Sequence, residues 1–205
     1  MSRKIGVFCI LLGICCLFSS VVFVGYNHWE ESRAKNASKY LLQDVQDKII
    51  YTTNIESDVE AVLGTETAVI EHEKITTMQV DGYDCIGVLS IPVLELELPV
   101  MTDWSYEKLK IAPCHYYGTY YETDFVIAAH NYQSHFGRIS ELQPKDLIMF
   151  TDISGTIHYY EVVLLETLPG NATKEMITSG FDLSLYTCTT GGSGRVTVRC
   201  KAVKK

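Results

Sequence analysis

The sequence predicts a mainly β fold: a closed or nearly closed eight-stranded β-barrel with short helices, preceded by a transmembrane helix and an amphipathic helix. Three observations support this fold class. An uncharged apolar run lies close to the N-terminus, and apolar residues at helical spacing follow that run. From residue 83 onward, short runs of β-branched and aromatic residues recur at regular intervals, which is typical of a barrel.

The N-terminal apolar run is long enough to cross a membrane. It extends from Ile5 to Tyr26, and its 22 residues would span roughly 30 Å of hydrocarbon as a helix. A secretory signal peptide would have a shorter apolar region. Arg3 and Lys4 precede the run, and positive charge is retained on the cytoplasmic side. We therefore expect a single-pass anchor in the cell membrane, with a cytoplasmic N-terminus and an extracytoplasmic remainder. A buried core helix is the alternative.

The charge distribution excludes some partners for the exported part. All 25 acidic residues but only 15 of the 17 basic ones follow the apolar run, so that part carries a net charge of −10. It contains no cluster of lysine and arginine, so we expect no nucleic-acid partner and no binding to anionic lipid. The exported length is sufficient for one domain with its own core.

The seven cysteines divide by position. Three lie in the apolar run, and Cys85, Cys114, Cys188 and Cys200 follow it. An even exported number could mean two disulfides, but a domain of this size does not need them. There is no C-x-x-C pair, so a zinc ribbon or a thioredoxin-type site is unsupported. One disulfide among Cys85, Cys114 and Cys200 remains open, whereas Cys188 has to stay free if it is a nucleophile.

An amphipathic helix is predicted after the apolar run, over residues 32–50. Its apolar residues recur at helical spacing; they are Ala37, Tyr40, Leu41, Val45 and Ile49. Residues 51–80 are acidic and rich in threonine, which indicates a stalk that holds the domain off the membrane. We therefore divide the chain into a cytoplasmic tip with the anchor (1–27), a helix with the stalk (28–80) and an extracytoplasmic β domain (81–205).

The β domain is expected to contain eight strands. Residues Leu94–Leu98 alternate between apolar and acidic, the pattern of a half-buried strand. The expected strands are Cys85–Ile91, Val93–Met101, Ala112–Tyr117, Phe125–His130, Leu147–Thr151, Thr156–Leu168, Leu183–Cys188 and Arg195–Val203. Short helices fit at Ser105–Ile111 and Phe136–Leu142.

A cysteine and an arginine flank a glycine-rich turn near the C-terminus. Cys188 ends one predicted strand, six residues separate it from Arg195, and a hairpin over that turn would place their Cα atoms about 5 Å apart. Arg199 shares the face but would lie about 13 Å further along. A guanidinium beside a thiol favours the thiolate and could stabilise an oxyanion. Taken singly, a strand-end cysteine is more often a small buried hydrophobe, and an arginine after a turn a solvated charge.

A histidine ends another apolar strand. His130 closes the run Phe125–His130, a rigid position that suits a general acid or base. His135 is the nearest competitor, and the two would supply only two metal ligands without a recognisable third, so we expect no metal and no cofactor. The other histidines lie in the stalk or in other predicted strands; they are His28, His72, His115 and His158.

These motifs, in this order, resemble those of the sortase family of cysteine transpeptidases. The matching segments are Ala128-Ala129-His130-Asn131, Ser184-Leu185-Tyr186-Thr187-Cys188 and Arg195. Ile86–Pro92 is similar to the opening strand of the family and Phe136–Leu142 to its short helix, so the resemblance covers about residues 83–203. Ala129 stands where glycine is common and Ser184 where threonine is common, and neither change removes a reacting group.

The resemblance implies a sortase barrel that cleaves an LPxTG-like sorting signal at the C-terminus of secreted proteins in a Gram-positive bacterium. Cys188 would form a thioester with the threonine carbonyl, and an amine, often on a peptidoglycan precursor, would release it as a new amide. His130 would act as acid and base, and Arg195 would hold the substrate or the oxyanion. The motifs also point to substrate-binding residues beside these groups, namely Thr187, Ala129 and Asn131.

The subclass is expected to be an anchoring enzyme rather than a pilin polymerase. The stalk contains no proline, so it lacks the Asp-Pro-aromatic lid motif of polymerising sortases, and no apolar tail precedes Lys204-Lys205. The segment Pro169–Asp182 is too short for the long helix that some sortases carry before the cysteine strand, and we expect it to set substrate preference.

Two other functions stay open from the sequence. A membrane-tethered cysteine protease or amidase, a thiol hydrolase, would use the same three residues with water as the acceptor. A barrel for adhesion or scaffolding would keep Cys188 as an inert core residue. The reactivity of Cys188 toward a mild alkylating reagent separates the scaffold from the two enzymes.

Overall fold

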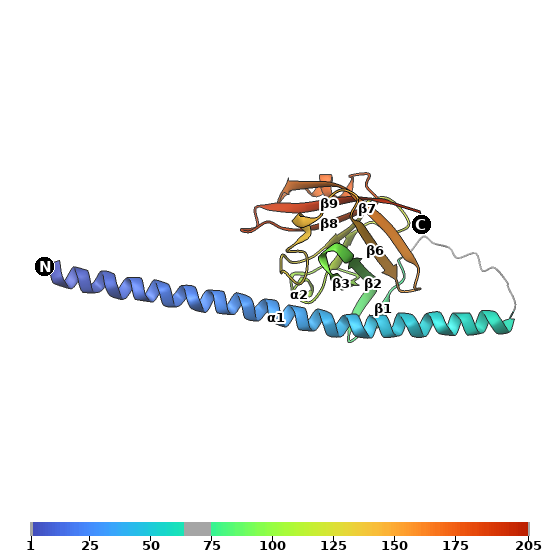
Figure 1. The fold of residues 1–205 in the computed structure, drawn as a ribbon, viewed down its shortest axis with the longest axis horizontal. Helices are drawn as coiled ribbons and strands as arrows, with labels where there is room; N and C mark the ends of the chain where they lie inside the picture. Colours follow the sequence, from blue (N-terminus) through green and yellow to red (C-terminus); the bar gives the residue numbers. More distant parts are fainter. Residues whose placement is uncertain (1, 64–74, 205) are drawn as a thin grey trace.

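The computed structural model describes residues 2–63 and 75–204, which form one long helix and a β-barrel packed against the middle of that helix (Figure 1). The helices are α1 (Ser2–Leu63), α2 (Tyr106–Leu109) and α3 (Thr173–Ile177), with 3-10 turns η1 (Pro92–Leu94) and η2 (Ile139–Glu141). The strands are β1 (Met78–Val80), β2 (Tyr83–Ile91), β3 (Leu96–Met101), β4 (Cys114–Tyr117), β5 (Phe125–Ala128), β6 (Leu147–Asp152), β7 (Ile157–Pro169), β8 (Leu183–Cys188) and β9 (Gly194–Ala202).

Eight strands close into a barrel. Their order is β2-β3-β4-β5-β8-β9-β7-β6, and β6 pairs back with β2. The β3–β4 and β5–β8 pairs are parallel, and the other pairs are antiparallel. β1 is a short extra strand on β2, beside the segment of β2 that pairs with β6. The predicted fold class, an eight-stranded barrel with short helices after an apolar helix, is confirmed.

Several elements differ from the prediction, among them one predicted strand start and one short helix. The stretch Val93–Glu95 was expected to begin the strand Val93–Met101, in which Leu94–Leu98 alternates between apolar and acidic residues. Instead, Val93 and Leu94 complete η1, and Glu95 directly follows it. Pro92 is pre-set for a helical turn, and Glu95 ends that turn in the left-handed region with a φ of 54°. The short helix α3 lies in the 169–182 segment, for which no helix was predicted. A pattern of period two does not distinguish a strand from a short turn of this kind.

The helix α1 is continuous from the apolar run to Leu63, so the prediction that a second helix ends near residue 50 was wrong. The sequence has no proline and no glycine between Asn27 and Leu63 that would end a helix. Of the predicted stalk, residues 51–63 are therefore helical, Met78–Val80 is a strand, and residues 64–74 lie outside the described residues. The division of the chain at residues 27 and 80 stays a prediction.

One side of α1 packs against the outside of the barrel. Leu41, Val45 and Ile49 are buried there, as predicted, against a second apolar cluster that includes Val88 and Met101. Tyr40 is 70% exposed, contrary to the prediction, because it is the chain neighbour of Leu41 and a helix turns by about 100° per residue. Two small residues at the same spacing, Ala34 and Ser38, are buried on this side as well.

The N-terminal part of α1 projects away from the barrel (Figure 1). The large apolar side chains of Ile5–Tyr26 are exposed, and no part of the most apolar window is covered by the rest of the chain. By length and composition this part of α1 is a candidate membrane span.

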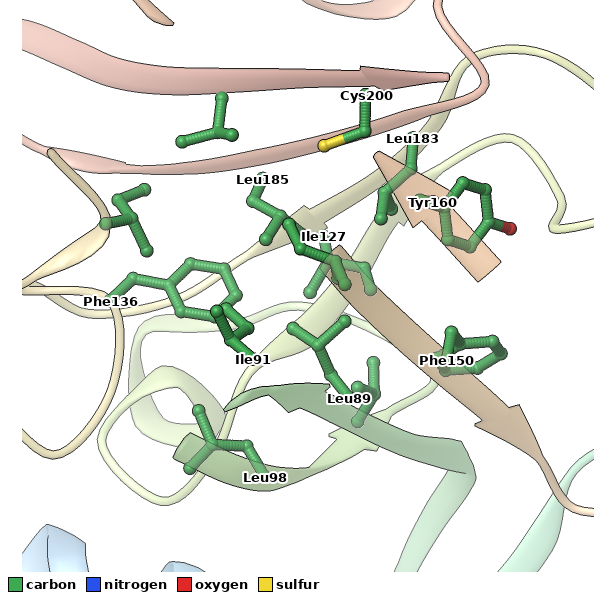
Figure 2. Packing of buried hydrophobic residues seen from close by; sticks show 14 of the residues in the cluster. Leu89, Ile91, Leu98, Ile127, Phe136, Phe150, Tyr160, Leu183, Leu185 and Cys200 are labelled. Atoms are coloured by element: carbon green, nitrogen blue, oxygen red, sulfur yellow. The ribbon is translucent and has the colours of Figure 1, made fainter. Parts of the chain in front are cut away.

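The interior of the barrel is filled by side chains from all around the ring (Figure 2). Because α1 covers β2 from outside, residues on both faces of β2 are buried. Leu89 and Ile91 point inward, whereas Val88 faces the helix. Fully burying a side chain of this size contributes about 1.5–3 kcal/mol. The fully buried interior residues include Leu89, Ile91, Phe125, Ile127, Phe136, Ile139, Ile148, Phe150, Leu183, Leu185, Val198 and Cys200.

The barrel closes at a glycine. Gly87 lies at the irregularity where β2 pairs with both β3 and β6. Its φ is 152°, and a Cβ atom there would overlap the carbonyl oxygen of Thr151 and lie 2.9 Å from the Phe150 ring. Only a residue without a side chain therefore lets β6 approach β2.

Replacing Gly87 by alanine should therefore open this seam. We expect Gly87→Ala to lower the free energy of unfolding by roughly 2–4 kcal/mol. The matched control is Gly82→Ala: Gly82 also has a positive φ, 80°, but no atom lies within 4 Å of its Cβ position. That control should cost about 1 kcal/mol, from backbone strain alone. Urea unfolding of the full-length protein in detergent measures both losses, and equal losses would contradict the seam.

Candidate active site

Cys188 ends β8, the strand that lies between β5 and β9. On the β9 side, Cys188 pairs directly with Arg195, so the predicted register is confirmed. On the β5 side, Ala128 pairs with Tyr186 in parallel register, and the Ala129 N–H donates to the Tyr186 carbonyl at 3.1 Å. β5 ends at Ala128, so the prediction that His130 itself ends this strand was wrong by two residues. If the register continued past that end, His130 would lie level with Cys188. Neighbouring strands are about 5 Å apart, so Arg195 flanks the cysteine on one side, and His130 is expected on the other.

The turn after Cys188 holds this alignment. The Thr189 N–H donates to the Gly194 carbonyl at 3.0 Å, and the Gly194 N–H donates back to Thr189 Oγ1 at 3.0 Å. Gly191 and Gly192 have φ values of 90° and 77°, a region that glycine enters without steric cost. Because the turn is tied at both of its ends, Arg195 cannot slide along β8 without breaking these bonds.

The four barrel cysteines have two kinds of environment. Cys188 is exposed, whereas Cys85, Cys114 and Cys200 are buried, and all are free thiols. No disulfide therefore joins the three buried ones. Burial raises the pKa of Cys85 and of Cys114 to about 12, and it also raises that of Cys200. The scaffold hypothesis requires Cys188 to be an inert core residue. The other three cysteines occupy such core positions, and Cys188 does not.

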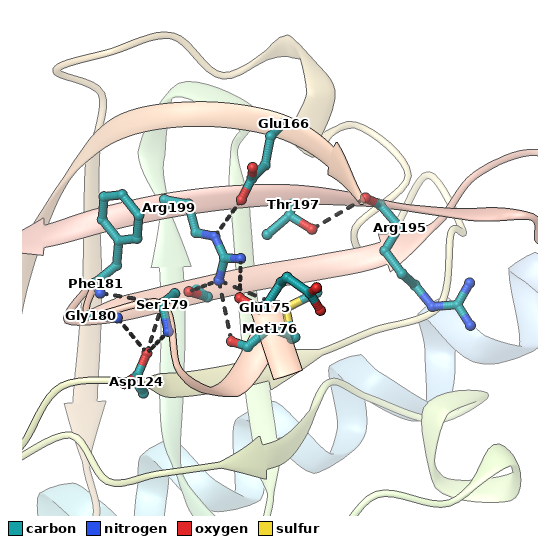
Figure 3. A network of polar contacts seen from close by, with 11 residues as sticks. Asp124, Glu166, Glu175, Met176, Ser179, Gly180, Phe181, Arg195, Thr197 and Arg199 are labelled. Atoms are coloured by element: carbon teal, nitrogen blue, oxygen red, sulfur yellow. Dashed lines mark hydrogen bonds and ion pairs between the residues drawn. The ribbon is translucent and has the colours of Figure 1, made fainter. Parts of the chain in front are cut away.

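The two arginines of β9 are also distinct (Figure 3). Arg195 is half-buried, and its Nη1 donates to the carbonyls of Gly192 and Gly194 at 3.1 and 2.9 Å. Its guanidinium thus stays at the end of the barrel where β8 ends. Arg199 is only 1% exposed, and its donors contact Glu166, Ser184 and the α3 carbonyls. Arg199 is therefore committed elsewhere, and Arg195 is the arginine beside the cysteine.

The three residues predicted to bind substrate differ in how far they are buried. Thr187 is buried, and its Oγ1 donates to the Ala129 carbonyl at 2.9 Å, a bond that joins the ends of β8 and β5. Ala129 is buried too, and Asn131 is half-buried beside His130. The structure thus gives Thr187 and Ala129 a part in aligning the strand ends. Substrate binding by the three residues stays a prediction.

A tyrosine and the long helix hold the loop that follows His130. The His130 and Tyr132 rings are stacked, with centroids 4.0 Å apart and an interplanar angle of 7°. The Tyr132 hydroxyl donates to Glu30 Oε2 at 3.3 Å, and the Gln133 N–H donates to Glu31 Oε1 at 2.9 Å. Both carboxylates come from the turn of α1 just after its apolar part. No signal in the sequence connects these positions, which are 102 residues apart.

A family comparison decides what kind of protein this is. The model of the sortase domain matches residues 89–203 of the chain. The chain belongs to the sortase family. Members of this family are cysteine transpeptidases, and the barrel described above is the sortase fold, so this sortase is a cysteine transpeptidase. A comparison with curated proteins gave no match.

Solved structures with the same fold are sortases of several classes. A sortase D5 transpeptidase from Clostridium perfringens has a TM-score of 0.61 and 21% identity, and covers 82% of this chain and 99% of its own. Sortase A from Corynebacterium diphtheriae has a TM-score of 0.55 and 17% identity, covering 89% and 96%. Sortase C from Clostridium perfringens, solved with the C-terminal cell wall sorting motif, has a TM-score of 0.53 and 20% identity, covering 80% and 91%. At these identities the likeness establishes the fold of this sortase alone.

Three other histidines, all in the barrel domain, have structural surroundings, whereas His72 lies outside the described residues. His135 is fully buried, and its burial, together with the nearby His130, lowers its pKa to about 4. The Ile111 carbonyl opposes that shift slightly, although neither ring nitrogen makes a hydrogen bond among the described residues. His115 bonds two backbone carbonyls, and His158 bonds Asp152 at 2.9 Å. Within residues 2–63 and 75–204, no three histidine, cysteine or acidic side chains lie close enough to hold a metal ion.

The environment of His130 favours its neutral form. Partial burial lowers the pKa of the imidazole below its usual range. The Asn131 side chain and the Glu30 carboxylate act against this shift, whereas the Lys110 ammonium adds to it. The Nδ1 atom is buried and has no hydrogen-bond partner among the described residues. A neutral ring at physiological pH is able to accept a proton, which suits a base.

We expect Cys188 to be the fast thiol of the barrel. Iodoacetamide at pH 7.5 should modify it at least about tenfold faster than Cys85, Cys114 or Cys200, because the thiolate is the reactive form and burial suppresses it in the other three. Peptide mapping of the full-length protein in detergent measures each rate. The cysteines of the apolar helix are resolved as a separate peptide. A second barrel cysteine that reacts as fast as Cys188 would contradict this prediction.

Removing the Glu30 charge should shift the titration of His130. The carboxylate stabilises the imidazolium, so Glu30→Gln is expected to lower the pKa of His130 further. Histidine proton resonances followed against pH report that pKa. The matched control is Glu31→Gln, which lies one position away on α1 and bonds the backbone of Gln133 instead. An unchanged or raised pKa in Glu30→Gln, or an equal shift in both variants, would contradict the role given to Glu30.

Proposed function

We propose that this sortase is a membrane-anchored transpeptidase that cleaves an LPxTG-like sorting signal and joins the cleaved protein to an amine of the cell wall. One observation carries the proposal: an exposed cysteine ends the strand between the one that leads to His130 and the one that carries Arg195. The Clostridium perfringens sortase C solved with a cell wall sorting motif supports a substrate of this class.

In the first half-reaction, the neutral imidazole of His130 takes the proton of the Cys188 thiol, and the resulting thiolate attacks the threonine carbonyl carbon of the sorting signal. A guanidinium donor of Arg195 stabilises the oxyanion of the tetrahedral intermediate. The C–N bond then breaks, and His130 gives its proton to the leaving amine. The product is a thioester between Cys188 and the threonine, and the imidazole of His130 is left neutral.

In the second half-reaction, an amine attacks the thioester. The neutral imidazole takes the proton of that amine, a new amide bond forms, and the Cys188 thiolate leaves. No oxidation or reduction occurs in either half. The burial that lowers the pKa of His130 supports this step, since it makes the ring ready to accept a proton. Two half-reactions on one nucleophile lead to ping-pong kinetics.

The anchor and its orientation follow from the ends of the apolar run. Ile5–Tyr26 has the length and the exposed apolar surface of a span. Arg3 and Lys4 before it favour a cytoplasmic N-terminus and an extracytoplasmic barrel. The acceptor would then be an amine outside the cell, on a peptidoglycan precursor or a similar molecule, and the donor a secreted protein with a C-terminal sorting signal.

Intact mass measurement with peptide pools tests this function. The full-length protein in detergent is mixed with LPxTG-like peptides, with and without a glycine or diamino-acid amine. We expect a thioester adduct on Cys188 that is released as an amide only when an amine is present. Cys188→Ala should form no adduct, and His130→Ala should lose at least about a hundredfold in rate.

The same experiment separates the alternatives. Hydrolysis of the peptides at a rate that no amine changes would favour a protease or amidase. No adduct with any peptide, together with an unreactive Cys188, would favour the scaffold. Arg195→Ala provides a third comparison, because loss of one oxyanion donor is expected to reduce the acylation rate by about a hundredfold or more without abolishing alkylation of Cys188.

A further inference from the structure

The segment between β7 and β8 is tied to the barrel by a buried arginine. Arg199 on β9 is 1% exposed, and its Nε donates to Glu166 Oε1 on β7 at 2.8 Å. Its Nη1 donates to Ser184 Oγ on β8 at 2.8 Å and to the Met176 carbonyl at 3.3 Å. Its Nη2 donates to the Glu175 carbonyl at 2.8 Å. One guanidinium therefore joins three strands to the helix α3 (Figure 3).

These contacts explain how α3 is ordered. A helix of five residues is too short to be stable by itself. No side chain caps its N-terminal end, and at its C-terminal end the Thr178 hydroxyl donates to the Lys174 carbonyl at 2.8 Å. Its last carbonyl oxygens carry partial negative charge, and a cation stabilises them. A buried guanidinium in turn needs a carboxylate and several acceptors to offset its lost hydration, and Glu166 with Ser184 and the α3 carbonyls provides them. The arginine and the helix thus depend on each other.

The far end of the segment is held by an aspartate. Asp124 Oδ1 accepts hydrogen bonds from the Ser179 N–H, the Ser179 hydroxyl and the Gly180 N–H, at 2.7, 2.8 and 2.9 Å. Asp124 lies directly before β5, the strand that leads to His130. The segment is therefore fastened at two points to the strands that carry the candidate catalytic residues.

The position of α3 relates it to Cys188. Side chains alternate along a strand, so Ser184 and Cys188 share one face of β8, and their partners Arg199 and Arg195 share the matching face of β9. Cys188 lies four positions after Ser184, a distance of about 13 Å. Since Arg199 holds α3 over the Ser184 end, the length of this face between α3 and the thiol matches an extended peptide of about four residues.

We propose that Arg199 is a positioning residue, which holds the 170–182 segment in the shape that receives the peptide substrate. It acts on substrate binding and not on the chemistry at Cys188, because its donors face α3 and Glu166. This inference rests on the proposed function for its substrate, but the ordering of α3 by Arg199 is testable without any substrate.

The test compares Arg199→Met with the wild-type full-length protein in detergent. Lys174 is an exposed residue of α3, so trypsin cleavage after it reports whether the helix is held. We expect this cleavage to become at least about tenfold faster, since each charge-assisted bond that is lost weakens the hold on α3. With a peptide that acylates the wild type, KM should rise about tenfold while kcat changes less than about threefold. Alkylation of Cys188 by iodoacetamide should stay within about twofold.

Three further variants serve as controls for Arg199→Met. Arg138→Met removes an arginine that also contacts a carboxylate and a carbonyl, but on η2 and η1, and it should change none of these measurements. Arg199→Met with Glu166→Gln removes both charges, so a folded double variant that repeats the effect excludes a stranded carboxylate as its cause. Arg199→Lys keeps the charge without the fork of donors and should rescue KM only in part.

Each outcome decides the inference. Unchanged cleavage after Lys174 and unchanged KM in Arg199→Met would overturn it. A fall in kcat and in the rate of Cys188 alkylation by the same factor as the rise in KM would also overturn it, if the melting temperature is lower in Arg199→Met and in Arg199→Lys. That result would show a role in overall stability alone. If the wild-type protein forms no acyl-enzyme with any peptide, the proposed function fails, while the trypsin measurement still decides whether Arg199 holds α3.

Discussion

The pairing of β8 with a parallel strand on one side and an antiparallel strand on the other is the constraint on which the site depends. Backbone hydrogen bonds place Cys188 opposite Arg195, and the parallel register with β5 brings His130 to the same edge. The bond from Thr187 to the Ala129 carbonyl extends this register to the strand ends. A shift by one residue would turn Cys188 into the core, because side chains alternate along a strand.

The surroundings of this edge are supplied by elements far apart in the chain. Glu30 and Glu31 of α1 hold the loop after His130, so the helix that leaves the candidate membrane span is also a neighbour of the site. On the other side, Arg199 and Asp124 fasten the segment that precedes β8. The barrel therefore provides rigid strand ends, and the adaptable parts of the site are loops attached to it, the usual division in proteins that bind through loops.

Much of this was predictable from local patterns. The hairpin register followed from a glycine-rich turn of six residues, and the eight strands from their spacing and composition. Patterns misled where two structures share a periodicity, as at Val93–Glu95, or where a helix has no residue that would end it, as after residue 50. Arg199 shows how far the site could be predicted from the sequence. Period-two counting assigns the face of β9 on which it lies, but its burial depends on the position of α3.

The sequence by itself determined the apolar helix, the barrel and the order of its histidine, cysteine and arginine motifs, because these depend on periodicity, turn chemistry and residue type over short distances. Only the tertiary structure decided which groups Arg199 contacts, which cysteines are buried, and which carboxylate acts on His130. Those properties depend on burial and on contacts between residues as far apart as Glu30 and Tyr132, and no local pattern carries them.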